Sequence, residues 1–328
     1  MDYINYVKQY PLSLTGMGGI IGGLAFAGVG YNTTEINAGD RGIIAGGAEN
    51  SSNKSTKILS FDITTTGNAT DSNKDIYDNE RQQGCSNGTR AVVGGGGNPY
   101  TNTIHYFNIP GTITNGSDFG DLTKAKSYFG CLSDGGRAVW GGGYDGTGPA
   151  LDDMDYVSIM TTGNAGDFGN MTRDVGQQSG SFSNGTRGIF SGGGDPGIDN
   201  AITYITISTL GNAADFGDLK DGTKKEGSGA SNAVRGLFMS CSGPGNNNSI
   251  EYITIAQLGN AIDFGDLNNN AELAASVASS TRGVAGGGTS PTKINVIDYV
   301  QIATTGNAVD FGDRTVAGYG AAGCSDAH

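Results

Sequence analysis

Five Asp-Phe-Gly triplets recur along the chain, and each sets a carboxylate beside an aromatic ring and a glycine. A carboxylate held in place can bind a divalent cation, accept hydrogen bonds from backbone amides or pair with an arginine. Six arginines recur at a matching spacing, so an arginine–aspartate pair joining the repeats is one hypothesis. The aspartates are Asp118, Asp167, Asp215, Asp263 and Asp310. The arginines are Arg41, Arg90, Arg137, Arg187, Arg235 and Arg282.

The Asp-Phe-Gly triplet is known from protein kinases, where its aspartate holds magnesium. Five evenly spaced copies, without a P-loop, a strand lysine or a His-Arg-Asp sequence, exclude that chemistry here. The structural alternative is that the phenylalanine wedges between neighbouring repeats while the glycine permits a sharp turn. These phenylalanines are Phe119, Phe168, Phe216, Phe264 and Phe311. The first repeat departs from the motif and reads Asp71-Ser72-Asn73-Lys74.

Other residues that carry chemistry are few. Turns rich in aspartate and asparagine at 145–153 and 195–200 offer oxygen ligands, so calcium binding stays an alternative, although neither turn has the spacing of an EF-hand. The two histidines and four cysteines show no metal-ligand spacing, and no Ser-His-Asp set stands apart from the repeat. We therefore predict no catalytic residue, no metal site and no cofactor, and a protein that is not an enzyme.

The elements that must position the motifs follow from the spacing of the arginines, which are 49, 47, 50, 48 and 47 residues apart. Each arginine begins an apolar run that ends in small residues and, in most copies, a glycine pair, as in RGIIAGG and RAVWGGG. A fixed period near 48 residues indicates a repeat architecture and suits the blade of a β-propeller. With 59 glycines and only 7 prolines, the chain also has the residues for many tight turns.

Each repeat contains four segments. Segment a is small and polar (QQGCSNGT), segment b is the arginine run, segment c alternates apolar and polar residues (ITYITIS), and segment d carries the Asp-Phe-Gly triplet. Asn-Gly or Asp-Gly pairs between a and b are typical of hairpin turns. The C-terminal GAAGCSDAH copies segment a but stops before an arginine. We therefore predict an all-β, six-bladed propeller whose final strand, within 319–326, pairs with the strand that begins at Arg41.

Two features of the N-terminal segment leave alternatives open. MDYINYV resembles a c strand, so a seventh, split blade is the alternative to six. Residues 12–31 carry no charge over about the length of a membrane span. Seven of these twenty residues are glycine, a poor helix former, so we predict no membrane span. We assign 1–32 to a docking arm and 33–328 to the propeller.

Overall charge excludes some classes of partner. The net charge of −13 argues against nucleic acid or an anionic membrane, and only 16% of the residues are charged. Three of the cysteines, Cys85, Cys131 and Cys324, lie in segment a. We expect small buried side chains facing a crowded centre. Disulfides between neighbouring blades are the alternative.

The glycine pair after strand b, the tyrosine of strand c and the aromatic residue of strand d resemble kelch repeats. TTGNAxDFGDL joined to SxxTRGxxxGG is more similar to kelch-like repeats in virion and tail-associated proteins of tailed bacteriophages. The resemblance covers about residues 40–328. It implies a tail or fibre component located in the virion, with other virion proteins as partners.

From this resemblance we expect a non-enzymatic structural protein that mediates subunit contacts through its N-terminal arm and attaches to a host surface glycan or protein. The first alternative is a cytoplasmic kelch-type interaction module. The second is a glycan hydrolase, since SDGG and SNGT are similar to the aspartate boxes of sialidase propellers. These copies lack the tryptophan of that motif.

Overall fold

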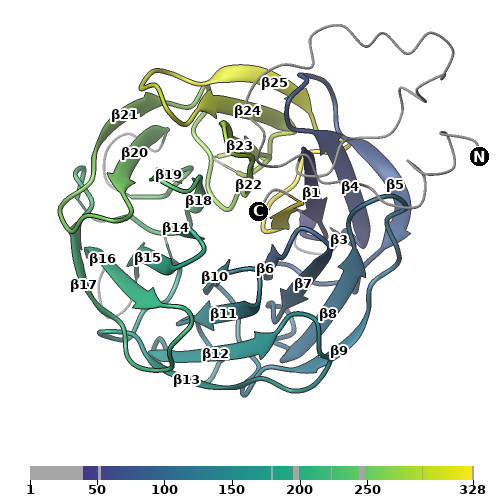
Figure 1. Ribbon diagram of the computed structural model, residues 1–328. Coiled ribbons are helices and arrows are strands. Elements are labelled where there is room, and N and C mark those ends of the chain that lie inside the picture. Colours follow the sequence, from purple (N-terminus) through teal and green to yellow (C-terminus); the bar gives the residue numbers. More distant parts are fainter. Residues whose placement is uncertain are drawn as a thin grey trace, which may run out of the picture. The chain divides into compact units, whose positions relative to one another are not determined.

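The computed structural model describes residues 40–50, 53–178, 180–194, 199–222, 224–243, 248–289 and 291–326. Over these ranges the chain forms six antiparallel sheets of four strands each and one short hairpin, with no helix. Figure 1 shows the six sheets arranged as blades around a central axis. The prediction of an all-β propeller with six blades is therefore confirmed.

Each blade has the strand order a-b-c-d from the axis outward, as the repeat predicted. For blades 1 to 6, the a strands are β26 (Ala322–Ser325), β6 (Gln83–Ser86), β10 (Gly130–Ser133), β14 (Gly180–Ser183), β18 (Ser228–Ser231) and β22 (Ala275–Ala278). The b strands are β1 (Arg41–Ala45), β7 (Arg90–Gly94), β11 (Arg137–Gly141), β15 (Arg187–Gly193), β19 (Arg235–Met239) and β23 (Arg282–Gly286). The c strands are β4 (Lys57–Asp62), β8 (Thr103–Asn108), β12 (Asp153–Ser158), β16 (Asp199–Thr206), β20 (Ser249–Thr254) and β24 (Val296–Gln301). The d strands are β5 (Thr70–Asp75), β9 (Ser117–Asp121), β13 (Gly166–Asn170), β17 (Ala214–Asp218), β21 (Ile262–Asp266) and β25 (Val309–Asp313).

The predicted closure of the ring is confirmed. Strand β26, at the C-terminal end, pairs antiparallel with β1 near the start of the described chain, with Ile43 opposite Cys324 and Ala45 opposite Ala322. The first blade thus combines strands from both ends of the described chain. Because β26 pairs with β1 in this way, the inner edge of β1 is not left open.

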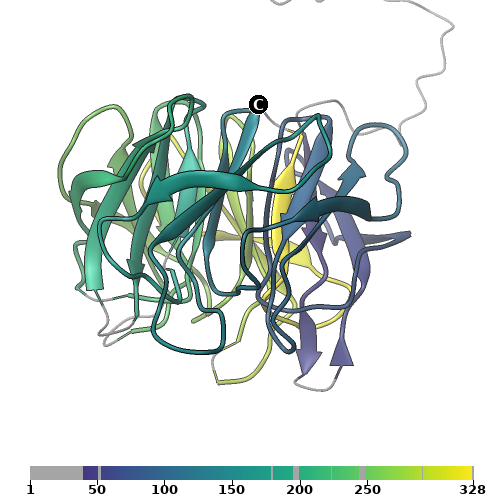
Figure 2. The ribbon, with the colours of Figure 1, turned by 90° about the horizontal axis from the view of Figure 1, so that it is seen from below.

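The strands end on two opposite faces of the propeller (Figure 2). We call the face with the a–b turns and c–d loops the turn face, and the face with the b–c loops and d–a connections the loop face. On the turn face, Asn184 Oδ1 accepts hydrogen bonds from the amides of Thr186 and Arg187, and Gly185 has a φ of 82°. This is the turn chemistry that the Asn-Gly pair predicted. The hairpin of β2 (Ala48–Asn50) and β3 (Asn53–Lys54) projects from the loop face.

A β-bulge lies between strands c and d in every blade, and in five blades it falls on the Asp-Phe-Gly triplet. In blade 4, Ile202 lies opposite Gly217 and Thr203 opposite Asp215, so Phe216 is the extra residue without a partner. A bulge re-aims the side chain of its extra residue. Phe216 is only 3% exposed and packs with Phe238 and Ile253 of blade 5.

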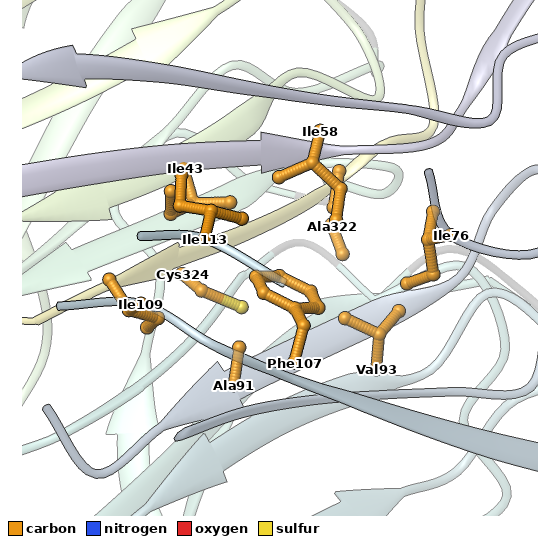
Figure 3. Packing of buried hydrophobic residues seen from close by; sticks show 11 residues of the cluster. Ile43, Ile58, Ile76, Ala91, Val93, Phe107, Ile109, Ile113, Ala322 and Cys324 are labelled. Carbon is orange, nitrogen blue, oxygen red and sulfur yellow. The ribbon is translucent and has the colours of Figure 1, made fainter. Parts of the chain in front are cut away.

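The core lies between blades rather than within them, because six buried clusters each combine two neighbouring blades. Figure 3 shows the cluster between blades 1 and 2, where Ile43 and Ile58 of blade 1 face Val93 and Phe107 of blade 2. Each blade is thus a two-sided sheet whose faces are both buried against its neighbours.

The N-terminal arm at 1–32 and the candidate strand of a seventh blade at 1–7 lie outside the described residues, as does His328. The described residues contain no helix that is long and apolar enough to cross a membrane.

Candidate functional site

The repeat arginines connect each blade to the next through the backbone. Their Nη1 atoms donate to the carbonyl oxygen of the isoleucine that follows strand c of the next blade. The pairs are Arg41–Ile109 (2.6 Å), Arg90–Ile159 (3.1 Å), Arg137–Ile207 (3.0 Å), Arg187–Ile255 (2.8 Å), Arg235–Ile302 (2.9 Å) and Arg282–Ile63 (2.9 Å). Six equivalent bonds therefore run around the whole ring.

In five blades the same guanidinium lies over the ring of the tyrosine on strand c of its own blade. The distances from Cζ to the ring centroid are 4.3 Å for Arg90–Tyr106, 5.3 Å for Arg137–Tyr156, 4.5 Å for Arg187–Tyr204, 4.3 Å for Arg235–Tyr252 and 4.5 Å for Arg282–Tyr299. Each tyrosine in turn meets the edge of its triplet phenylalanine. A stacked guanidinium with a fixed acceptor is held in one orientation, so these arginines are structural.

The triplet aspartates do not join the arginines. Among the described residues no ion pair links a repeat arginine to Asp118, Asp167, Asp215, Asp263 or Asp310, and all five side chains are exposed. The arginine–aspartate hypothesis is therefore wrong. Each guanidinium donates instead to the carbonyl oxygen of the isoleucine that follows strand c of the next blade. The alternative role, accepting a backbone amide, is seen at Asp167, whose Oδ1 accepts from the amide of Gly169 at 3.0 Å.

The rest of the triplet holds the loop of the following blade against the outer strand. Between blades 3 and 4, the amide of Gly211 donates to the oxygen of Phe168 at 2.9 Å and the amide of Ala213 to that of Asn170 at 2.8 Å. Asn212 Oδ1 accepts from the amide of Asn170 at 3.0 Å. In five blades a Gly-Asn-Ala sequence before the d strand covers the outer edge of the d strand of the preceding blade, which would otherwise invite edge-to-edge pairing.

The glycine of the triplet makes this approach possible. Gly169 has a φ of 137°, and a Cβ there would lie 2.5 Å from the carbonyl oxygen of Gly211. The triplet glycines of the other four copies have the same conformation. The first repeat lacks the triplet. At that junction the amide of Gly116 donates to Asp75 and the amide of Asp75 to Asn115 Oδ1, so the contact is kept in altered form.

The possible calcium turn at 145–153 has its carboxylates engaged within the protein. Asp145 Oδ1 accepts from the amide and hydroxyl of Thr147, and Asp153 pairs with Lys124 and Lys126. The turn at 195–200 is described only at its last two residues. Over the ranges that the structure describes, no group of three histidine, cysteine or acidic side chains could hold a metal ion.

A cavity of about 630 Å³ lies on the axis, lined by the a strands of all six blades and open toward the a–b turns. Its hydroxyl groups serve contacts between blades. Ser86 donates to the carbonyl of Ser325, Ser183 to that of Ser133, and Ser231 to that of Ser183. The wall therefore consists mainly of glycine, small side chains and serines, several of which already donate to the backbone of a neighbouring blade.

On the loop face the axis is surrounded by a closed circuit of six backbone hydrogen bonds. Each bond joins the d–a connection of one blade to that of the preceding blade. They run from the amide of Arg81 to Gly320, Tyr128 to Arg81, Gln178 to Tyr128, Glu226 to Gln177, Leu273 to Glu226 and Gly320 to Leu273. Five non-glycine residues adopt a left-handed φ of 51–60° to make it: Arg81, Tyr128, Gln177, Glu226 and Leu273. Such residues are uncommon and mark positions where the surrounding structure imposes the conformation.

The sequence did not indicate this circuit, because it is formed by backbone amides and carbonyls and requires a backbone conformation rather than a particular residue type. Its side chains are all different, so the repeat motif does not extend to this position. The result is a ring of dissimilar side chains on an otherwise repetitive scaffold. We call the polar and aromatic residues of the circuit, together with their direct side-chain partners, the axial belt. Its members are Glu80, Arg81, Tyr128, Tyr144, Gln177, Lys225, Glu226 and Tyr319.

One half of the axial belt is aromatic and basic. Arg81 lies 4.8 Å from the centroid of Tyr128 and 5.8 Å from that of Tyr319, and it pairs with Glu80. Glu80 is 2% exposed and its Oε2 accepts from the hydroxyl of Tyr319 at 3.1 Å. Tyr144 meets Tyr128 edge-on with centroids 6.1 Å apart. The guanidinium is thus fixed between two rings while its side chain keeps 24% exposure.

The other half is a chain of polar side chains across blades 4 and 5. Gln177 donates through Nε2 to Glu226 at 2.6 Å and accepts through Oε1 from Lys225 at 3.2 Å. Burial raises the pKa of Glu226, an effect that Lys225 opposes and Glu272 reinforces. Charges of both signs are therefore set in fixed positions close to the axis.

No protein-family model matches the chain, and no curated protein matches it either. The fold and the geometry above therefore define the protein as a closed six-bladed β-propeller.

Proposed function

We propose that the chain is a non-enzymatic binding propeller, a structural and attachment component of a bacteriophage virion. The observation that carries this proposal is that the repeated residues make the structural contacts, whereas the axial belt consists of residues that are not repeated. Arginine, tyrosine, phenylalanine and glycine of the repeat are committed to contacts within a blade and to joints between blades. The axial belt is built from residues that differ from blade to blade, as expected where a partner is recognised.

The chemistry of the axial belt favours a polyhydroxylated partner, a glycan of the host surface. The partly exposed Tyr128 and Tyr144 offer aromatic surface, while Arg81, Gln177 and Glu226 present fixed donors and acceptors. Among the members of the axial belt, Glu80 and Glu226 balance Arg81 and Lys225, so the axial belt has no excess of one sign of charge. A neutral glycan therefore fits better than a phosphate-rich polymer, which a chain of net charge −13 also repels.

The placement in a virion rests on the resemblance of the repeat to phage tail-associated kelch-like sequences. Under this proposal the residues at 1–32 form the docking arm toward other virion proteins. Mass spectrometry of purified, fractionated particles tests this part directly. Recovery of the chain with tail components supports it, and recovery only from the host cytoplasm favours a cellular interaction module instead.

Binding by the axial belt is tested with the purified chain on an array of neutral and acidic bacterial surface polysaccharides. We expect retention on one or more neutral polysaccharides, with affinity reduced at least tenfold in Arg81→Ala and in Glu226→Gln. Met160→Ala, an exposed substitution on the turn face, is the control and keeps the wild-type affinity. Equal loss in all three variants, or release of reducing sugar during incubation, contradicts the proposal.

A further inference from the structure

Three of the four cysteines line the axial cavity on consecutive blades. Cys324 is on β26 of blade 1, Cys85 on β6 of blade 2 and Cys131 on β10 of blade 3. Cys241 lies apart, after β19 of blade 5. All four are free thiols in the structure, and none has a role in the joints or the axial belt described above.

The register of the a strands determines which two thiols face each other. In two seams the second residue of an a strand lies against the third residue of the a strand before it. A Cβ on Gly84 would lie 3.1 Å from Sγ of Cys324, and a Cβ on Gly229 would lie 2.7 Å from the ring of Phe182. Cys131 is the second residue of its strand and Cys85 the third residue of the preceding one. These two thiols therefore occupy facing positions across the seam between blades 2 and 3.

Two further contacts agree with this pairing. Cys85 packs against the buried cluster that contains Cys131. Cys324, by contrast, directs its Sγ toward the backbone oxygen of Cys85 at 3.7 Å, and the residue at its own facing position is Gly84, which has no thiol. Cys85 and Cys131 are thus the one facing pair among the described cysteines.

We infer that Cys85 and Cys131 form a disulfide between blades 2 and 3 when the protein meets a small oxidant such as a peroxide. Both S–H bonds break and one S–S bond forms. The two thiols lose two electrons and two protons, and one molecule of hydrogen peroxide is reduced to two molecules of water. The half-buried Cys85 is the thiol that the oxidant reaches first, through the open cavity.

This bond would covalently link blades 2 and 3. It closes a loop from residue 85 to residue 131, and a crosslink over such a loop restricts the unfolded chain. We expect the thermal midpoint to rise by about 5 °C on oxidation and to fall again with a reductant. Burial raises the pKa of Cys131, so the thiolate that attacks the oxidised Cys85 is scarce at neutral pH, and the reaction should become faster as the pH rises to mildly alkaline values.

The test uses the full chain, reduced and then treated with hydrogen peroxide. Remaining thiols are alkylated after unfolding, and the digest is analysed without reductant by mass spectrometry. We expect a crosslinked peptide pair containing Cys85 and Cys131, with Cys241 and Cys324 alkylated. Four alkylated thiols, or a crosslink that includes Cys324 or Cys241, overturns the inference.

Matched serine variants separate the bond from general effects of oxidation. Cys85→Ser and Cys131→Ser should lose the shift in thermal midpoint, whereas Cys241→Ser should keep it. A shift that persists in Cys85→Ser contradicts the inference. The peptide analysis of the wild-type chain decides the matter even where a variant does not fold.

Discussion

The guanidinium of Arg282 donates to the carbonyl oxygen of Ile63 at 2.9 Å, although 219 residues separate the two in the chain. This bond connects blade 6 to blade 1, and five equivalent bonds connect the other neighbours. The same guanidinium stacks on Tyr299 of its own blade. One side chain thus fixes both its position in a blade and the position of the next blade.

Replacing a joint arginine should weaken the ring. For Arg187→Ala we expect the free energy of unfolding to fall by about 2 kcal/mol, because a charged hydrogen bond and a stacked cation are lost together. Arg187→Lys should recover part of this loss, since an ammonium can reach the carbonyl but cannot stack as a plane. Denaturant unfolding measures both. Lys220→Ala, which changes an exposed side chain, is the control. An equal loss of stability in all three variants would contradict the stabilising role of the Arg187 contacts.

The glycine of the triplet should tolerate no side chain. Gly169→Ala brings a Cβ to 2.5 Å from the oxygen of Gly211 and also strains a φ of 137°, so we expect a loss of about 3 kcal/mol. Gly211→Ala has the unfavourable φ but open space around it, and should cost less. Gly148→Ala has neither problem and should stay within about 0.5 kcal/mol of wild type. Thermal unfolding of the three variants gives the order, and any other order contradicts the steric explanation.

The loop that covers each outer strand should also protect the protein from association. Asn260 Oδ1 accepts from the amide of Asp218 at 3.1 Å, so Asn260→Ala should cost about 1 kcal/mol and loosen the cover on β17. An uncovered edge strand is a template for pairing with another chain. We expect more aggregate by light scattering on prolonged warming. Asn184→Ala, on a turn away from any outer edge, is the comparison, and equal aggregation would count against the idea.

The ion pair between the buried Lys126 and Asp153 makes the stability of the fold depend on pH in the acid range. Burial alone would raise the pKa of Asp153, but the charges and hydrogen bonds of Lys126 and Lys124 outweigh it and hold the pKa below its ordinary value of 3.8. The stabilisation is therefore complete above pH 3.8 and is lost as the pH falls through the lower pKa of the folded state. Lys126 is fully buried and pairs with both Asp153 and Asp155 at 3.0 Å.

Asp153→Asn should lower the free energy of unfolding by about 3 kcal/mol at pH 7, because a buried ammonium loses one of its two carboxylates. The difference from wild type should shrink as the pH is lowered below 4. Unfolding curves between pH 3 and pH 7 measure it. Lys74→Ala is the control, because Lys74 takes part in none of the ion pairs among the described residues. Its difference from wild type should not change as the pH is lowered.

Much of the scaffold was predictable from sequence. The spacing of the arginines gave the number of blades, the alternation of ITYITIS marked strand c, and the unfinished copy GAAGCSDAH predicted the pairing of β26 with β1. The burial of the triplet phenylalanines was also predictable, because an aromatic residue repeated at blade spacing has to pack between repeats. These features depend on local periodicity and on copy number, which a single sequence displays.

The sequence by itself therefore determined the six blades, their strand order and the closure of the ring, since each blade repeats the same local hydrophobic pattern. Only the tertiary structure decided the partners across the seams. The arginines bond to Ile carbonyls instead of aspartates, and the axial circuit of Arg81, Tyr128 and their equivalents uses backbone groups. Every residue offers a carbonyl and nearly every one an amide, so such bonds leave no signature in residue type. They become visible only when the neighbouring blade is in place.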